Sequence, residues 1–234
     1  MTAQKKATGT LALVGGGEWS DGCDSLDASL LGASHGSDVV VLPTAAAFEQ
    51  PADTVERAIS WFEKLGATVR PVMVLNRRDA DNDANVKAVK GASFVYIADG
   101  SPLHLRSALK GSQLWDVITA AYRAGAVLAA SGAGATVVCD PMVDPRGGAY
   151  TVGLGLVRGL AVFPYHGTAA DHLRDRSLDL LPRDAVLAGL DEHTALIRDA
   201  DGQWRAEGTG NVTLYRKNEP NEAVHDDAVP SLTL

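Results

Sequence analysis

The chain has 234 residues, of which 46% are hydrophobic, and a formal net charge of −8. This length suits one large α/β domain, and the hydrophobic content excludes an intrinsically disordered chain. The acidic charge argues against nucleic acid as a partner, because phosphate binding needs clustered Lys and Arg. The sequence has neither an apolar run of the roughly 20 residues that span a bilayer nor a start resembling a signal peptide. We therefore expect a cytoplasmic protein without a membrane partner.

Metal and disulfide chemistry find little support in the sequence. Two cysteines, Cys23 and Cys139, are too few for a disulfide framework, and the six histidines lack the spacing of metal ligands. We predict no metal and no cofactor.

Strand-like apolar runs alternate with helical segments along the first half of the chain. Strands are predicted at 10–14, 38–42, 68–75, 93–98 and 126–130, and helices at 25–33, 54–65, 82–90, 103–109 and 113–124. Such alternation is typical of a parallel sheet covered by helices on both faces. The predicted fold is α/β, a flavodoxin-like three-layer α/β/α sandwich with a mostly parallel sheet.

The pattern becomes less regular beyond Pro141. A strand is predicted at 160–163, a helix at 169–181, and short strands at 186–190, 194–197, 203–207 and 211–215. We find no internal repeat and no linker, so residues 9–216 are expected to form a single domain. Residues 1–8 are predicted to be a flexible N-terminus, and the polar segment 217–234 a disordered tail.

The most informative motif follows the strand at 126–130. It has the strand-to-helix pattern of a nucleophile elbow, G-x-S-x-G, in which a strained turn lifts one side chain into the active site. The five elbow positions are Ala130, Ser131, Gly132, Ala133 and Gly134.

Gly132 occupies the nucleophile position and has no side chain with which to attack a carbonyl. Side chains alternate along a strand, so Ser131 should point away from the direction of Gly132. Glycine at the apex could also relax the turn and redirect Ser131. A missing nucleophile and a displaced one therefore both remain open.

A second candidate segment follows the strand at 93–98. Acyl transfer needs two donors aimed at the developing oxyanion, and a backbone N–H of Gly100 or Ser101 could act with that of Ala133. Ser101 also suits the N-cap of a helix with Pro102 at its first position. The two roles are compatible.

Three further segments lie at predicted strand ends. The glycine turn before Glu18 does not match the spacing of a dinucleotide or phosphate loop, but ligands of open α/β sheets bind at such ends. Gly17 and Glu18 are therefore candidate binding residues. His166 follows the elbow in sequence, as a general base can, and the acidic pair at 191–192 could supply a carboxylate that orients an imidazole. A structural histidine and a simple turn are the alternatives.

Together these segments resemble the cyanophycinase and dipeptidase E family of serine peptidases, which have the class I glutamine-amidotransferase-like fold. The matching segments are 15–18, 42–45, 76–80, 94–105, the elbow, 153–156, the strand leading to His166, and 189–195. The resemblance implies a nucleophilic serine at the position of Gly132, His166 as the base, and Glu192 as the residue that orients the base.

Three departures from the family pattern concern function. Glycine replaces the elbow serine, and the loop that typically reads G-G-D/N-Q is Asp99-Gly-Ser-Pro102, so that proline replaces a substrate-contacting glutamine. Gly167 and Thr168 replace the aromatic or acidic residues expected after the histidine.

Two functions follow from these departures. The first is a serine-peptidase-like hydrolase scaffold that is inactive or weakly active and binds a small peptide-like or amino-acid-derived ligand. The alternative is an active peptide or amide hydrolase in which Ser131 is a displaced nucleophile acting with His166 and Glu192. Whether the protein is an enzyme therefore stays open. Exposed apolar helix faces could support a homodimer.

Overall fold

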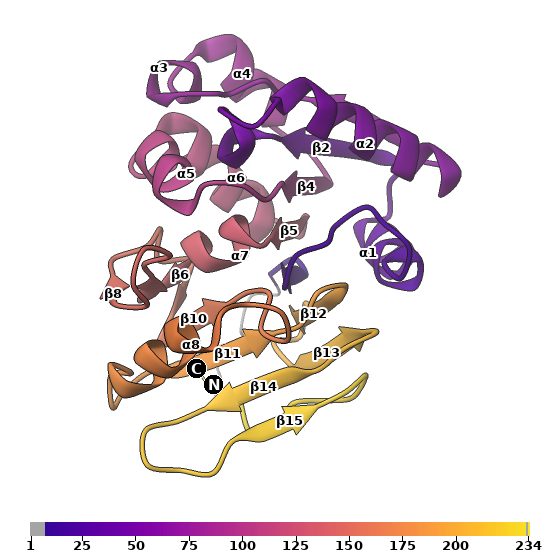
Figure 1. Ribbon diagram of the computed structural model, residues 1–234. Helices are drawn as coiled ribbons and strands as arrows, with labels where there is room; N and C mark the ends of the chain where they lie inside the picture. Colours follow the sequence, from indigo (N-terminus) through magenta and orange to yellow (C-terminus); the bar gives the residue numbers. More distant parts are fainter. Residues whose placement is uncertain (1–7, 233) are drawn as a thin grey trace, which may run out of the picture.

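A computed structural model describes residues 8–232 and 234, and its centre is a seven-stranded sheet (Figure 1). The strand order is β13-β12-β1-β5-β4-β2-β3. The parallel strands are β1 (Leu11–Val14), β2 (Asp38–Leu42), β3 (Thr68–Pro71), β4 (Phe94–Ile97) and β5 (Val127–Ser131). Two antiparallel strands, β12 (Thr194–Arg198) and β13 (Trp204–Gly208), complete one edge. Residues 1–7 of the predicted flexible N-terminus lie outside the described residues.

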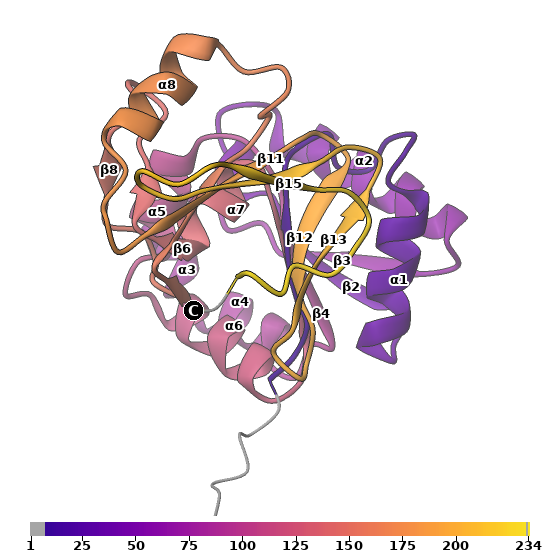
Figure 2. The same cartoon turned by 90° about the horizontal axis from the view of Figure 1, so that it is seen from below.

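Helices cover both faces of this sheet, as Figure 2 shows. One face packs against α1 (Asp24–Ser34) and α2 (Pro51–Lys64), and the other against α5 (Pro102–Leu109), α6 (Gln113–Arg123) and α7 (Ala133–Val138). Alternate strand residues divide between the two faces: Ala12 and Val14 belong to the first core, Leu11 and Leu13 to the second. The predicted flavodoxin-like α/β/α sandwich is confirmed.

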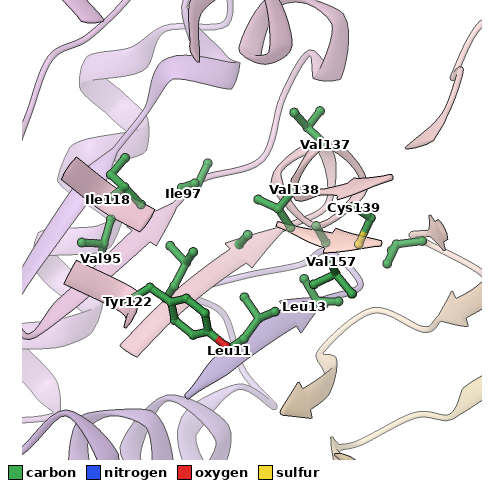
Figure 3. Close-up of a cluster of buried hydrophobic side chains, with 14 of the residues drawn as sticks. Leu11, Leu13, Val95, Ile97, Ile118, Tyr122, Val137, Val138, Cys139 and Val157 are labelled. Carbon is green, nitrogen blue, oxygen red and sulfur yellow. The ribbon is translucent and has the colours of Figure 1, made fainter. Parts of the chain in front are cut away.

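The second core contains the apolar side chains that hold the elbow in place. Figure 3 shows Leu11, Leu13 and Ile97 of the sheet together with Ile118 of α6 and Val138 of α7. All five are at most 1% exposed, so α7 is fixed against the strands by dense apolar packing.

Local signals explain where the helices near the site begin. Ser101 is the N-cap of α5, with its Oγ accepting a hydrogen bond from His104 N and Pro102 at the first helical position. Ser112 caps α6 in the same way. Two short helices, α3 (Arg77–Ala80) and α4 (Asp83–Val89), begin after the capping side chains of Asn76 and Asn82. A 3-10 turn, η1 (Thr44–Ala46), follows β2.

The later strands form a second sheet, which the sequence pattern did not predict. Its order is β15-β14-β11-β10-β6-β9, and it lies beside the main sheet in orange to yellow (Figure 1). Its strands are β6 (Cys139–Asp140), β9 (Val157–Arg158), β10 (Leu160–Phe163), β11 (Val186–Leu190), β14 (Val212–Tyr215) and β15 (Glu222–Val224). A small hairpin of β7 (Met142–Val143) and β8 (Tyr150–Thr151) and the helix α8 (Asp171–Asp179) pack near it.

The C-terminal segment differs from the expected disordered tail. In the structure β15 pairs with β14, and Val229 N donates a hydrogen bond to Trp204 O at 2.8 Å. Val229 and Leu232 are buried in the second core, which also contains Leu11 and Leu13. These two apolar side chains attach a segment whose polar composition alone favours disorder. Among the described residues, no helix combines the length and apolar character needed to cross a bilayer.

Candidate active site

The strand-to-helix turn of the predicted elbow is present between β5 and α7. Gly132 has φ +47° and ψ −104°, a conformation that side-chain-bearing residues adopt only under strain. Its N–H donates to Val14 O at 2.9 Å, which ties the turn to β1. The turn therefore has the strained strand-to-helix backbone predicted for an elbow, with no side chain at its apex.

The carboxylate of Asp99 fills the space in front of Gly132. Asp99 follows β4, the neighbour of β5 in the sheet. A Cβ atom added to Gly132 would overlap Cγ and both carboxylate oxygens of Asp99. A serine side chain at position 132 therefore fits only if the Asp99 side chain moves.

The same carboxylate binds both candidate oxyanion donors. Asp99 Oδ1 accepts hydrogen bonds from Gly100 N and Ala133 N, each at 2.6 Å. Tyr165 OH donates to Asp99 Oδ2, and burial followed by the Asp99 charge raises the pKa of Tyr165, which keeps the phenol protonated. Ser101 N donates instead to Ala45 O. The N–H groups of Gly100 and Ala133 thus point to one position, which Asp99 Oδ1 occupies. The N–H group of Ser101 points elsewhere.

Glu18 lies behind Asp99 and binds the hydroxyl next to the elbow apex. Its Oε1 accepts from Asp99 N at 3.1 Å and its Oε2 from Ser131 Oγ at 2.8 Å. Desolvation and the nearby charge of Asp99 raise the pKa of Glu18. Ser131 is 0% exposed, so its hydroxyl serves an internal contact.

The glycine turn after β1 makes room for Tyr165. A Cβ atom on Gly16, whose φ is +116°, would overlap the Tyr165 ring. Tyr165 N also donates to Gly15 O at 2.8 Å. The turn therefore holds the phenol that contacts Asp99, while Gly17 and Glu18 border the adjoining cavity.

His166 follows β10 and has hydrogen-bonding partners on both ring nitrogens. Nε2 is 2.8 Å from Tyr215 OH, and Nδ1 is 3.4 Å from Asp191 Oδ1. Glu192 instead accepts a hydrogen bond from Thr168 Oγ1 at 3.0 Å. The structure thus brings His166 together with Asp191 and not with Glu192, and within the described residues no hydrogen bond joins His166 to Ser131.

Two cavities meet at Asp99. A polar cavity of about 440 Å³ lies on the Glu18 side, and its other charged lining residues are Glu49 and Arg57. A largely apolar cavity of about 260 Å³ lies on the other side, between α5, β10 and α8. Asp99, Gly100 and Tyr165 border both. In the part of the chain that the structure describes, no cluster of three or more His, Cys, Asp or Glu side chains could hold a metal ion.

Asp99, Tyr165 and Tyr215 were not singled out from the sequence, and Asp191 was considered only as one member of the acidic pair at 191–192. One signal was available for Asp99, because it stands in the loop position where the family pattern has glycine, while glycine stands at the serine position. The structure shows that Asp99 and Gly132, which both depart from the family pattern, lie next to each other. The tyrosines belong to segments distant in sequence and carry no motif.

A match to a family model covers residues 11–203, and the chain therefore belongs to peptidase family S51. The cyanophycinases of Nostoc sp. (strain PCC 7120) and Trichormus variabilis are each 27% identical to it over 203 residues. The match covers 80% of this chain but only 65% of each cyanophycinase.

Two solved structures share the fold. A peptidase from an acI-B1 Actinobacterium is 28% identical, with a TM-score of 0.86 over 96% of this chain and 98% of that chain. A putative peptidase E protein from Listeria monocytogenes EGD-e, 17% identical, has a TM-score of 0.63 over 90% of this chain and 99% of that one. The predicted resemblance is confirmed, and the chain has a peptidase-like hydrolase scaffold.

Proposed function

We propose that this chain is an S51-family protein that binds a small peptide-like ligand and turns peptides over weakly or not at all. The observation that carries the proposal is the position of Asp99, whose carboxylate lies in front of Gly132 on both candidate oxyanion donors. The ligand would bind beside Asp99, where the two cavities meet.

Acyl transfer needs a nucleophile and donors that are free to stabilise an oxyanion. Gly132 supplies no nucleophile, and Gly100 N and Ala133 N already bind an anionic oxygen. In a serine-protease triad, loss of the nucleophile costs on the order of 10⁶ in rate. We therefore expect only trace turnover.

The candidate base is also engaged. In a serine triad one imidazole nitrogen faces a carboxylate and the other faces the nucleophile. In this chain Nδ1 of His166 faces Asp191, but Nε2 contacts Tyr215 OH at 2.8 Å. His166 borders neither of the two cavities. This arrangement supports a binding role for the site.

The hydrogen bond between Ser131 and Glu18 favours a second candidate function, peptide or amide hydrolysis by a displaced Ser131. Glu18 would then accept the serine proton, because Ser131 Oγ contacts Glu18 and not His166. Productive attack requires reacting atoms held about 3–3.5 Å apart. Ser131 is fully buried and borders neither cavity, which makes this the weaker candidate.

The experiment that separates the two functions is intact-mass analysis after incubation with a fluorophosphonate. We expect no adduct on the natural sequence. An adduct that disappears in Ser131→Ala would overturn the proposal and establish Ser131 as the nucleophile. Hydrolysis of a dipeptide library at ordinary enzymatic rates, abolished by His166→Ala, would contradict it as well.

The same assay tests whether Asp99 blocks the elbow. Gly132→Ser alone should remain unlabelled, because Asp99 occupies the space of the new side chain. Gly132→Ser with Asp99→Ala should be labelled slowly, since the space and both N–H donors become free while His166 stays hydrogen-bonded to Tyr215. Gly132→Ser with Asp99→Asn is the matched control: the amide keeps the bulk of the carboxylate without its charge and should also stay unlabelled.

A further inference from the structure

The apolar cavity beside the elbow has one charged side chain in its lining. Its walls come from separate elements, with Pro102 at the start of α5, Val143 in β7, Phe163 in β10 and Leu173 in α8. Among the described residues that line it, Asp99 alone carries a charged group. An apolar enclosure with a single carboxylate fits a ligand that is itself apolar with a single positive charge.

The Asp99 carboxylate keeps one acceptor position for such a ligand. A carboxylate has about four lone-pair sites, two on each oxygen. Oδ1 accepts from two backbone N–H groups and Oδ2 accepts from Tyr165 OH. One lone-pair position on Oδ2 therefore has no partner among these contacts. The three hydrogen bonds to the other positions fix the orientation of the carboxylate.

We propose that this cavity binds the apolar side chain of an amino-acid derivative or peptide whose protonated α-amine is held by Asp99. This inference rests on the proposed function and specifies its ligand class. The volume of about 260 Å³ is below the roughly 300–1,000 Å³ of sites for drug-sized ligands, so it suits one side chain. Burial of the apolar side chain and a hydrogen bond from the charged amine both favour binding of such a ligand.

Isothermal titration calorimetry at pH 7 with three matched probes tests the proposal. L-Leucinamide carries the amine and the apolar side chain, N-acetyl-L-leucinamide lacks the charge, and glycinamide lacks the side chain. An α-amine with a pKa of about 7.7–8.0 is mostly protonated at this pH. We expect leucinamide to bind at least about tenfold more tightly than either of the other two.

Two variants assign the binding to this cavity. Asp99→Asn keeps the shape but removes the charge, and should weaken leucinamide binding about tenfold or more while leaving N-acetyl-L-leucinamide nearly unaffected. Ala169→Leu adds bulk inside the cavity and should weaken leucinamide binding by a similar factor. Its exposed neighbour is the matched control, because Ala170→Leu adds the same bulk outside the cavity.

Equal binding of leucinamide and N-acetyl-L-leucinamide would overturn the role of Asp99. Unchanged leucinamide binding by Ala169→Leu would overturn the placement of the side chain, and no binding of leucinamide would overturn the ligand class. In the last case the proposed function still stands if another peptide-like ligand binds without turnover. Fluorophosphonate labelling of the natural sequence, by contrast, contradicts the proposed function itself.

Discussion

The candidate site has an elbow end, around Gly132 and Asp99, and a histidine end, around His166. At both ends the candidate catalytic groups already have hydrogen-bonding partners within the chain, but the two ends differ in their access to the cavities. At the elbow end, Asp99 fills the oxyanion position, borders two cavities and keeps an unused acceptor site. At the histidine end, His166 has partners on both nitrogens and borders neither cavity.

Asp99 is therefore open to both cavities, whereas His166 borders neither of them. A peptidase needs both ends to act on one carbonyl group, with the base facing the nucleophile. In this chain the carboxylate that occupies the oxyanion position also belongs to the charged residue that lines both cavities. The Asp99 carboxylate therefore occupies the space that a side chain at position 132 would need.

The largest effect on stability that we predict is at the elbow end, where Asp99 fills the space beside Gly132. Gly132→Ser should lower the free energy of unfolding by about 4 kcal/mol, because overpacking costs about 1–3 kcal/mol and a strained backbone about 1–3 kcal/mol more. Urea unfolding followed by far-UV circular dichroism measures this. A loss below about 1 kcal/mol would mean that Asp99 moves away easily.

The second prediction concerns Asp27, a buried acid in α1. Burial, opposed by a hydrogen bond from Trp61, raises the pKa of Asp27 to about 7. A raised folded-state pKa gives stability that is present below the unfolded value of 3.8 and is lost as pH rises through about 7.

Asp27→Asn should remove most of this loss. The unsubstituted protein should lose about 4 kcal/mol of unfolding free energy between pH 4 and pH 8 through Asp27, and the variant should not. The amide oxygen can still accept the hydrogen bond that Trp61 Nε1 donates at 2.8 Å. Urea unfolding at both pH values tests this. Equal pH dependence in the two proteins would show that Asp27 is ionised throughout.

The smallest effects should distinguish the two acids at the histidine end. Asp191 accepts a hydrogen bond from Asn211 N at 2.8 Å in addition to its contact with His166. Among the described residues, the Glu192 carboxylate accepts a side-chain hydrogen bond from the exposed Thr168 only. We expect Asp191→Ala to cost about 1–2 kcal/mol and Glu192→Ala to stay within about 0.5 kcal/mol. The same unfolding assay measures both. The reverse order would mean that Glu192, and not Asp191, makes the stabilising contact at this end of the site.

Much of the fold was predictable because its signals are local. Continuous apolar runs marked the parallel strands, and capping side chains such as Ser101 marked helix starts. The second sheet depends on pairing between segments far apart in sequence, such as β10 with β11. The C-terminal segment is attached through the buried side chains of Val229 and Leu232. The mean polarity of the segment does not reveal the effect of two single apolar residues.

The site was predictable in its backbone and less so in its partners. The elbow turn and the convergence of Gly100 and Ala133 follow from how neighbouring strands end in a parallel sheet. Which carboxylate meets His166 depends on one residue of register after β11, which no periodicity resolves. The place of the Asp99 carboxylate depends on the missing Cβ of Gly132, a contact between two loops.

A double-mutant cycle tests most directly whether Asp99 occupies the space of the elbow side chain. The unfolding free energy would be measured for the natural sequence, Gly132→Ser, Asp99→Ala and the double variant. We predict that the double variant is at least about 2 kcal/mol more stable than the sum of the single effects implies, because Asp99→Ala frees the space that the introduced serine side chain needs. Effects that add within about 0.5 kcal/mol would contradict the account, because residues without a shared contact behave in that way.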